Sequence, residues 1–491
     1  MSEIIKKFAE KGFLISPTLV PKITDHTKFL DFLETNFKNK ISVVTEEIYK
    51  NFVSGCLTFT KNNKDVKIVK EREVKQDGSK VEITKIYEHE NKKRDISDWV
   101  GYYNSRFEQI KNFLYHRIEL QGAISINRLI SRDMKELATI AMVKSISKSK
   151  FGNFIIELED TTGVIKGVVS KNSPCIQKVE ELVEDEVIGV LGSKSREMIF
   201  IQDIIFPDIP EKETKKCNEE VYACFIADTH VGSKMFLSSA FDRFLKWLNL
   251  ELGDEKQKEI AKKIRYLFVV GDLVDGVGIY PEQENELLIK DIYQQYEEFA
   301  KLIQRVPERI SVIISPGNHD ALRIAEPQHA LYDDIAKPVY QLPNVIMTSN
   351  PSYVRIHAID DFPGFDVLLY HGYSLDYFVA NVPKLRRYGY ERADLLMKFL
   401  LRKRHLAPTH GSTLFAPMQN DFLVIDKVPD IFATAHIHKA RVGCYRNVIN
   451  ICCSCWQDRT VFQERVGHVP EPGRVPIFNL KTREVKMMRF I

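Results

Sequence analysis

Five short polar motifs lie in the C-terminal half of the chain, and their side chains are of the types that bind metal ions. The ligand atoms that these motifs share belong to Asp, His and Asn, a set that suits a pair of hard-to-borderline divalent cations. The motifs are Asp228-Thr229-His230, Gly271-Asp272-Leu273-Val274-Asp275, Gly317-Asn318-His319-Asp320, His371-Gly372 and His436-Ile437-His438.

A short apolar segment comes directly before each motif or within two residues of it, and such a segment is typical of a buried strand. In an open α/β sheet, ligands bind beyond the carboxyl ends of the strands, so the five motifs are expected to converge. Residues i and i+2 of a strand share a face, so Asp228 and His230 should bind one cation together, and His436 and His438 should project alike. The apolar segments are residues 221–227, 266–270, 310–314, 367–370 and 431–435.

The order of these motifs resembles that of the calcineurin-like metallophosphoesterase superfamily. The resemblance implies an α/β fold of the four-layer β-sandwich type over residues 215–491. It also implies two divalent metal ions, with Mn²⁺ expected and Mg²⁺, Fe²⁺ or Zn²⁺ as alternatives. The implied ligands are Asp228, His230 and His438 for the first ion, Asn318, His371 and His436 for the second, and Asp272 as a bridge between both.

Three further residues of these motifs are candidates for roles beside the ligands. His319 adjoins Asn318, so its side chain should point away from the metals; the resemblance implies that it faces the phosphate and assists the leaving oxygen. Asp320 could orient the His319 ring. Asp275 could be a hydrogen-bond partner of a ligand or the N-cap of a helix. The alternative for His319 is an ordinary hydrogen-bonded loop histidine.

The composition is that of a globular protein with two or three domains. The 491 residues are 44% hydrophobic and 28% charged, and the net charge of +3 carries little information about nucleic acid. No apolar stretch approaches the roughly 20 residues of a membrane helix, and the N-terminus lacks the apolar core of a signal peptide, so we expect a cytoplasmic protein. Cys452 and Cys455 form one C-x-x-C pair, but a second pair is missing, which favours reduced thiols over a zinc site.

The N-terminal region divides into two segments. Residues 1–55 have helical periodicity and are interpreted as a helical module, either a small bundle or a docking module for partner proteins. Residues 56–100 are highly charged and predict a linker, although Asp77-Gly78 could close a hairpin.

Residues 101–212 predict a helix followed by an all-β domain. The strands, expected at residues 136–146, 154–160, 164–169, 186–191 and 199–206, resemble a nucleic-acid-type OB-fold barrel. Lys144, Lys148, Lys150 and Phe151 combine basic and aromatic groups, which suits single-stranded nucleic acid. The alternative is a protein-docking barrel.

An OB-fold followed directly by a phosphoesterase domain resembles the small subunits of archaeal D-family DNA polymerases. That resemblance implies a 3′–5′ exonuclease that proofreads for a large catalytic DNA polymerase subunit. Its substrate would be DNA with a single-stranded or frayed 3′ end, and no membrane would be involved. A non-catalytic polymerase scaffold and a stand-alone metallophosphatase or phosphodiesterase are the alternatives. Every ligand position is filled, which disfavours the scaffold.

Overall fold

A computed structural model describes residues 80–89, 93–131 and 133–491, together with parts of the chain between residues 4 and 49. The chain forms two compact units, Met1–Lys67 and Ile68–Ile491. The first unit contains helix α2 (His26–Phe37), the 3₁₀ turn η1 (Val20–Lys22) and two short parallel strands, β1 (Leu14–Ile15) and β2 (Val43–Val44). The predicted boundary at residue 55 and the possible hairpin at residues 77–78 lie outside the described residues.

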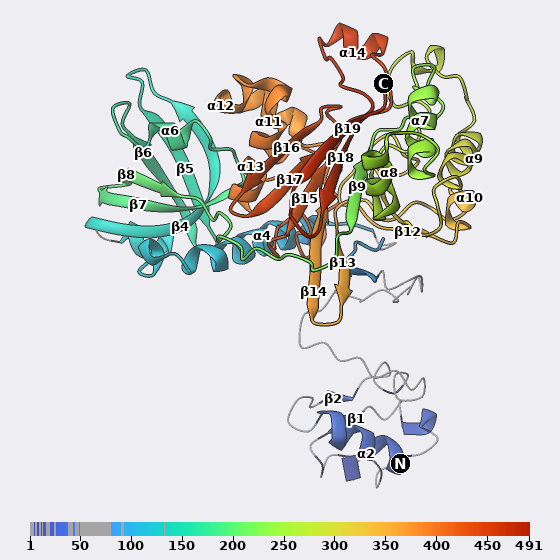
Figure 1. The fold of residues 1–491 in the computed structure, drawn as a ribbon. Helices are drawn as coiled ribbons and strands as arrows, with labels where there is room; N and C mark the ends of the chain where they lie inside the picture. The colour runs from blue at the N-terminus through green and yellow to red at the C-terminus, as the bar shows by residue number, and fades with distance from the viewer. Residues whose placement is uncertain are drawn as a thin grey trace. The chain divides into compact units, whose positions relative to one another are not determined.

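Two six-stranded sheets form the larger part of the second unit (Figure 1). The central strands of the first sheet are parallel and almost entirely buried, as expected for a sheet that is covered on both faces. Its order is β12 (Val345–Met347), β11 (Ser311–Ser315), β10 (Ile264–Val270), β9 (Tyr222–Ile226), β18 (Arg474–Asn479) and β19 (Val485–Arg489). The order of the second is β16 (Arg441–Tyr445), β17 (Val448–Cys452), β15 (Ile431–Thr434), β14 (Phe362–Leu369), β13 (Ser352–Ile359) and β3 (Val81–Lys85).

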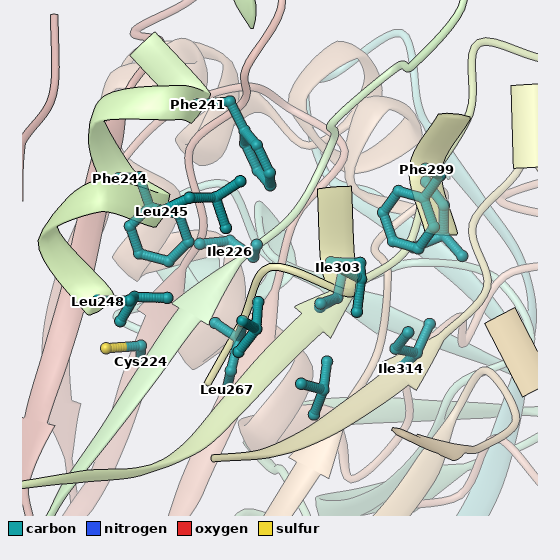
Figure 2. Packing of buried hydrophobic residues seen from close by; sticks show 14 of the residues in the cluster. Cys224, Ile226, Phe241, Phe244, Leu245, Leu248, Leu267, Phe299, Ile303 and Ile314 are labelled. Atoms are coloured by element: carbon teal, nitrogen blue, oxygen red, sulfur yellow. The ribbon is translucent and has the colours of Figure 1, made fainter. Parts of the chain in front are cut away.

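The two sheets face each other, because successive side chains of one strand, β9, point alternately to the other sheet and to the helices. Ala223 and Phe225 of β9 belong to a core that also contains residues of the second sheet, whereas Cys224 and Ile226 pack against helices. Those helices are α7 (Ser238–Leu248) and α9 (Ile292–Ile303), and Figure 2 shows Phe241, Phe244 and Leu245 of α7 above the strand.

Another helical layer covers the outer face of the second sheet. Its core joins α11 (Leu375–Asn381) and α13 (Ala393–Lys403) to Leu368 and Phe432 of the sheet. The layers therefore run helix, sheet, sheet, helix, and the mixed α/β architecture expected from the sequence is confirmed. The remaining helices of this part are α8 (Glu255–Lys262), η3 (Gln283–Asn285), α10 (Lys337–Tyr340), α12 (Pro383–Arg386), η4 (Gly389–Arg392) and α14 (Val461–Arg465).

A closed five-stranded barrel precedes the two sheets in the sequence. Each strand begins within two residues of its predicted start, and the long first strand of the barrel pairs with both the second and the fourth in sequence, which closes the barrel. Helices α4 (Ile96–Tyr115), α5 (Ile126–Ile130) and α6 (Ile176–Val179) and the turn η2 (Ile118–Leu120) accompany it. The barrel order is β4 (Met134–Lys148), β5 (Phe154–Asp160), β6 (Gly163–Val169), β8 (Met198–Ile205) and β7 (Val187–Ser195).

Part of the predicted linker is a strand. Residues 81–85 form β3 and pair antiparallel with β13 at the edge of the second sheet. Their charged side chains are used there: Glu82 contacts Arg355 at 3.4 Å, and Lys85 contacts Asp426 at 3.1 Å. Charge is common on edge strands because it opposes pairing with other chains, and the same charge suggested a linker in the sequence.

Helix α4 joins the barrel to the sheets through a fully buried arginine. It begins at a capping box formed by Asp95 and Asp98. Arg106 donates from Nε to Asp421 Oδ2 at 2.7 Å and from its NH1 group to the carbonyl of Pro408. His405 Nε2 lies 2.8 Å from the same Asp421 oxygen. Each charge in this group has a partner, as buried charges require.

A second buried ion pair crosses the same junction. Lys403, at the end of α13, donates to both carboxylate oxygens of Glu186, which directly precedes β7, at 2.6 and 2.8 Å. Burial lowers the pKa of Lys403 to about 8 against the attraction of Glu186. The barrel and the sheets thus share charged groups that neither could leave unpaired.

The thiols near β17 are buried and reduced. Cys452 and Cys455 are free, and burial raises the pKa of Cys452 to about 12. In the described part of the chain, none of the clusters of possible metal ligands includes a cysteine. None of the helices described combines the length and apolar character that a bilayer span requires.

Candidate metal centre

The carboxyl ends of five strands position the five motifs. Strands β9, β10 and β11 run parallel in the first sheet, and β14 and β15 run parallel in the second. The motifs begin within three residues after the last residue of each strand: Ile226, Val270, Ser315, Leu369 and Thr434. The predicted convergence at the strand ends is therefore the arrangement that the fold has.

The local geometry differs from the predicted one, because the side chains leave from turns and not from strands. Asp228 and His230 have φ values of 49° and 48°, and Asp272, His436 and His438 also lie in the left-handed region. The expectation that residues i and i+2 share a strand face is wrong here. The left-handed conformation costs about 1–2 kcal/mol per non-glycine residue, and such strain is concentrated at functional sites.

The first cluster of ligand atoms consists of Asp228, His230 and His438. One ligand atom from each lies within 4.8 Å of the others, and all three residues are buried. The Nε2 atoms of His230 and His438 are 3.2 Å apart. His438 Nε2 lies 3.8 Å from Asp228 Oδ1, so the three side chains surround one small volume.

Asp272, His371 and His436 form the second cluster, which meets the same distance criterion. His371 Nε2 lies 3.2 Å from Asp272 Oδ2 and 3.0 Å from Asn318 Oδ1. The same Asp272 oxygen is 3.8 Å from His230 Nε2 of the first cluster. Asp272 therefore stands between the two clusters, and all seven side chains that the sequence singled out as ligands are brought together.

Two glycines of the motifs permit this close approach. A Cβ on Gly317 would lie 2.2 Å from Asp272 Oδ1, and one on Gly271 would lie 2.3 Å from His371 Nδ1. Gly271 also has a φ of +83°, which side chains rarely adopt. Glycine at both positions is therefore a requirement of the site.

The charges of the site are unbalanced in a way that a cation would correct. Asp228 Oδ1 is buried and has no hydrogen-bond partner among the described residues. Burial raises the pKa of Asp228 well above its usual value, and the nearby charge of Asp272 raises it further. Burial would also raise the pKa of Asp272, but the charge of His371 holds it well below its usual range. An unpaired buried carboxylate oxygen beside several imidazole nitrogens fits a metal ion.

Hydrogen bonds orient the imidazoles so that one nitrogen of each faces the site. His371 Nδ1 donates to the carbonyl of Val270 at 2.9 Å, and His230 Nδ1 lies 3.1 Å from Asp275 Oδ1. His436 Nε2 lies 3.0 Å from Asp376 Oδ2, which leaves Nδ1 of that ring toward the site. Such partners raise the basicity of a ligand and fix its tautomer. Asp275 is thus a hydrogen-bond partner of His230, a candidate ligand, and no helix begins at it.

His319 lies at the edge of the site, and the residue that orients its ring is not the predicted one. Its Nδ1 atom donates to the carbonyl of Asp275 at 2.8 Å. Asp320 instead accepts from the backbone of Gly317 at 2.8 Å and from the hydroxyl of Tyr296, so the expectation that it orients the His319 ring is wrong. Asp320 is buried, and its carboxylate also accepts from the backbone of Leu273 at 3.3 Å. Burial, then Asp272, raises the pKa of Asp320 to about 7.

A pocket of about 340 Å³ opens over these residues. Several side chains that line the pocket could not be predicted from the sequence, because they come from loops and short helices without motif spacing. Asp376 follows His371 by five residues, a spacing that is typical of neither a helix face nor a strand face. The missed lining residues with polar or aromatic side chains include Tyr280, Tyr373, Asp376, Tyr390, Phe462, Gln463 and His468.

The four candidate nucleic-acid contacts lie on the barrel and not around this pocket. Phe151 is 82% exposed in the turn between β4 and β5, beside the exposed Lys150. Lys148 lies over the ring of Phe154 at 5.4 Å, and Lys144 contacts Glu157 at 3.8 Å. These side chains share one β-hairpin and are accessible.

Known proteins resemble this chain over its whole length. Residues 223–440 match the calcineurin-like phosphoesterase family. The DNA polymerase II small subunit of Methanothermobacter thermautotrophicus is 38% identical over 98% of this chain and 98% of its own length. The DNA polymerase II small subunit of Archaeoglobus fulgidus is 34% identical over 99% of this chain and 97% of its own length. This chain therefore belongs to the family of DNA polymerase II small subunits, and within it residues 223–440 are a calcineurin-like phosphoesterase domain.

Proposed function

We propose that this chain is a metal-dependent phosphodiesterase that removes nucleotides from the 3′ end of DNA, as the proofreading subunit of a DNA polymerase. The observation that carries the proposal is the gathering of seven Asp, His and Asn side chains beside one pocket. Among the described residues, Asp228 Oδ1 has no hydrogen-bond partner. The relatives' name adds the context: a small subunit of a DNA polymerase implies a separate large catalytic subunit as partner.

The phosphoesterase family implies divalent metal ions, and we assign their ligands from the two clusters. Asp228, His230 and His438 would hold one ion, and Asn318, His371 and His436 the other, with Asp272 between them. Divalent ions bound here would neutralise the phosphodiester and activate a water for attack. We propose Mn²⁺ as the activating ion, with Mg²⁺, Fe²⁺ and Zn²⁺ as the alternatives to be compared with it.

His319 supplies the proton for the leaving oxygen. Its Nδ1 atom is committed to the carbonyl of Asp275, because a carbonyl can only accept. Nε2 is therefore the atom that gains and loses the proton, and the ring borders the pocket. A ligand atom of His319 also lies within 4.8 Å of ligand atoms of His230 and Asp272, so ligation is the competing role for this side chain.

Asp376 positions a ligand rather than touching the substrate. Its Oδ2 atom holds Nε2 of His436, and its Oδ1 atom accepts a hydrogen bond from the hydroxyl of Tyr390 at 2.8 Å. Partial desolvation in the pocket would raise the pKa of Asp376, but the charge of His436 holds it below its usual value. The carboxylate thus aims Nδ1 of His436 at the second cluster.

We assign the five-stranded barrel to the OB-fold class, and propose that its β4–β5 hairpin guides the DNA strand. The strand order β4-β5-β6-β8-β7 and the closure by β4 support the assignment. Lys144, Lys148, Lys150 and Phe151 would then contact the strand through charge and stacking. The competing role of this surface is contact with the large subunit.

An unpaired 3′ end is the expected substrate, because only an unpaired terminus can reach a pocket of this size. Unpairing a matched end costs about 1–2 kcal/mol per stacked step, and a mismatch lowers that cost. Single strands should therefore be cut faster than mismatched primer ends, and those faster than matched ends.

The test is digestion of 5′-labelled and 3′-labelled oligonucleotides by the purified chain, alone and with its large subunit. Chelator should abolish the release of mononucleotides from the 3′ end, and Mn²⁺ should restore it. Full activity in chelator after exhaustive dialysis contradicts the two-metal site. Release of phosphate from phosphoproteins, or hydrolysis of cyclic nucleotides to nucleoside monophosphates, with no cleavage of DNA in either setting, favours a stand-alone phosphatase or phosphodiesterase. Association with the large subunit without any hydrolysis favours a scaffold.

A further inference from the structure

A pair of stacked aromatic rings forms one wall of the pocket, and the roles assigned above do not use it. Tyr280 comes from the loop that follows β10, and Phe462 comes from α14. Their ring centroids are 5.2 Å apart, with an interplanar angle of 26°. Both residues line the pocket beside His319 and His438. Segments far apart in the sequence thus meet to build this wall.

The aromatic wall lies next to the candidate catalytic residue His319 and the candidate ligand His230. The ring of Tyr280 lies 6.3 Å from that of His319, and the ring of His319 lies 4.6 Å from that of His230. A substrate whose phosphate sits at the metal ligands would therefore extend its next group onto the aromatic pair. In a nucleotide, the groups next to the phosphate are the sugar and the base.

Phe462 is exposed and Tyr280 is partly buried, and hydrogen bonds and an ion pair hold the pair in place. Phe462 is 45% exposed, and Val466, which lines the same wall, is 62% exposed. Arg465 contacts Glu282 at 3.4 Å, which links α14 to the loop of Tyr280. The hydroxyl of Tyr280 donates to Glu286 at 3.2 Å, and Thr460 and Gln463 form a capping box at the start of α14. An apolar surface that is fixed from both sides but left open is suited to bind a flat ligand.

We propose that Tyr280 and Phe462 form a stacking platform for the base of the nucleotide whose phosphodiester is cut. The inference rests on the proposed function, and it adds that the site selects nucleotides by stacking and not by base identity. Every base has an aromatic face, so such a platform accepts any sequence. A proofreading site needs this tolerance, because any of the four bases can be misincorporated.

The first test compares two oligonucleotides that differ only in the 3′-terminal residue, which carries a base in one and is an abasic analogue in the other. The chain should cut the base-bearing end faster. Phe462→Ala and Tyr280→Ala should lower kcat/KM for that end about 10-fold or more, the effect of losing one aromatic–base stack, and leave the abasic end unchanged. Phe462→Trp should restore the preference. Val461→Ala is the matched control, because Val461 is 47% exposed on the same helix but does not line the pocket.

The second test does not depend on hydrolysis. An oligonucleotide with 2-aminopurine at its 3′ end, bound to the chain in chelator, should lose fluorescence through stacking, and either alanine variant should abolish that loss. Quenching without cleavage of any oligonucleotide would retain the platform and refute the proposed function. Absence of quenching by the unmodified chain overturns the platform. Equal slowing of both ends by the variants, or weaker association with the large subunit with the base preference intact, also overturns it.

Discussion

Two groups of buried charged residues in this chain differ in whether the protein itself provides hydrogen-bond partners for their carboxylate oxygens. At the junction of the barrel with the sheets, both oxygens of Asp421 are used: Oδ2 by Arg106 and His405, and Oδ1 by the backbone of Leu423 at 3.0 Å. At the candidate metal centre, Asp228 Oδ2 accepts from the backbone of His436, but Oδ1 has no hydrogen-bond partner within the part of the chain described. The charges at the junction have their partners within the protein, whereas Oδ1 of Asp228 fits a bound cation.

The backbone shows the same contrast. Of the residues in the junction cluster, neither Arg106 nor Asp421 nor His405 has a positive φ, whereas five of the seven candidate ligands do. Strain and an unpaired charge are tolerated where a ligand compensates for them. Burial of charge by itself therefore does not mark a functional site; incomplete pairing, together with strained backbone, does.

The largest expected effect is at the metal centre. Asp272→Asn should reduce hydrolysis to background, because an amide has no charge to neutralise the two ions between which Asp272 stands. The variant should still bind the large subunit, since Asp272 is buried beneath the pocket. The measurements are oligonucleotide digestion and copurification. Loss of binding in a folded variant would mean that the site and the subunit interface overlap.

His319→Ala should lower turnover by about 10²–10⁴-fold, the usual loss when a positioned proton donor is removed. Its metal content should stay that of the unmodified chain, because the assigned ligands do not include it. Elemental analysis and kinetics on the same sample test both statements. The exposed His116, at the end of α4, provides the control: His116→Ala should leave both quantities unchanged. An emptied metal site would reassign His319 to ligation.

In the junction, a single substitution should affect stability and not chemistry. Asp421→Ala leaves Arg106 buried without its carboxylate, which should lower the free energy of unfolding by about 3–5 kcal/mol. Asp426→Ala removes the partner of Lys85 in a pair whose carboxylate is 45% exposed, and it should cost at most about 1 kcal/mol. Urea unfolding followed by circular dichroism compares the two. Equal costs would show that Arg106 finds other partners in the variant.

Acid should destabilise the junction through His405. Burial lowers the pKa of His405 to about 4, so the folded chain holds the neutral ring. In the unfolded chain the pKa is about 6.5, so below pH 6.5 the unfolded state binds a proton that the folded state does not. The free energy of unfolding should therefore fall as the pH is lowered from 6.5 to 4, by about 2 kcal/mol at pH 5 for this group. His405→Gln should show a correspondingly weaker dependence between pH 7 and pH 5. An unchanged dependence would exclude His405 as its source.

Much of the fold could be predicted from local patterns. The apolar segments before the motifs are strands β9, β10, β11, β14 and β15, and the turn signals around residues 150–163 correctly separate β4, β5 and β6. The strand β3 could not be predicted, because its charged residues are stabilised by Arg355 and Asp426, which lie about 270 and 340 residues further along the chain. An edge strand and a linker have the same composition.

The candidate site divides in the same way. Motif order and residue type predicted that the five motifs gather, since parallel strands bring their carboxyl ends to one edge, and the family resemblance indicated the seven candidate ligands among them. Only the tertiary structure decided how they are aimed: by left-handed turns instead of a strand face, and by Asp376, which no spacing connects to His436. The stack of Tyr280 on Phe462 was likewise a result of folding alone. The residue types of the candidate ligands belong to short motifs of local sequence. The orientation of their side chains and the walls of the pocket depend instead on contacts between segments that are separated along the chain by irregular distances.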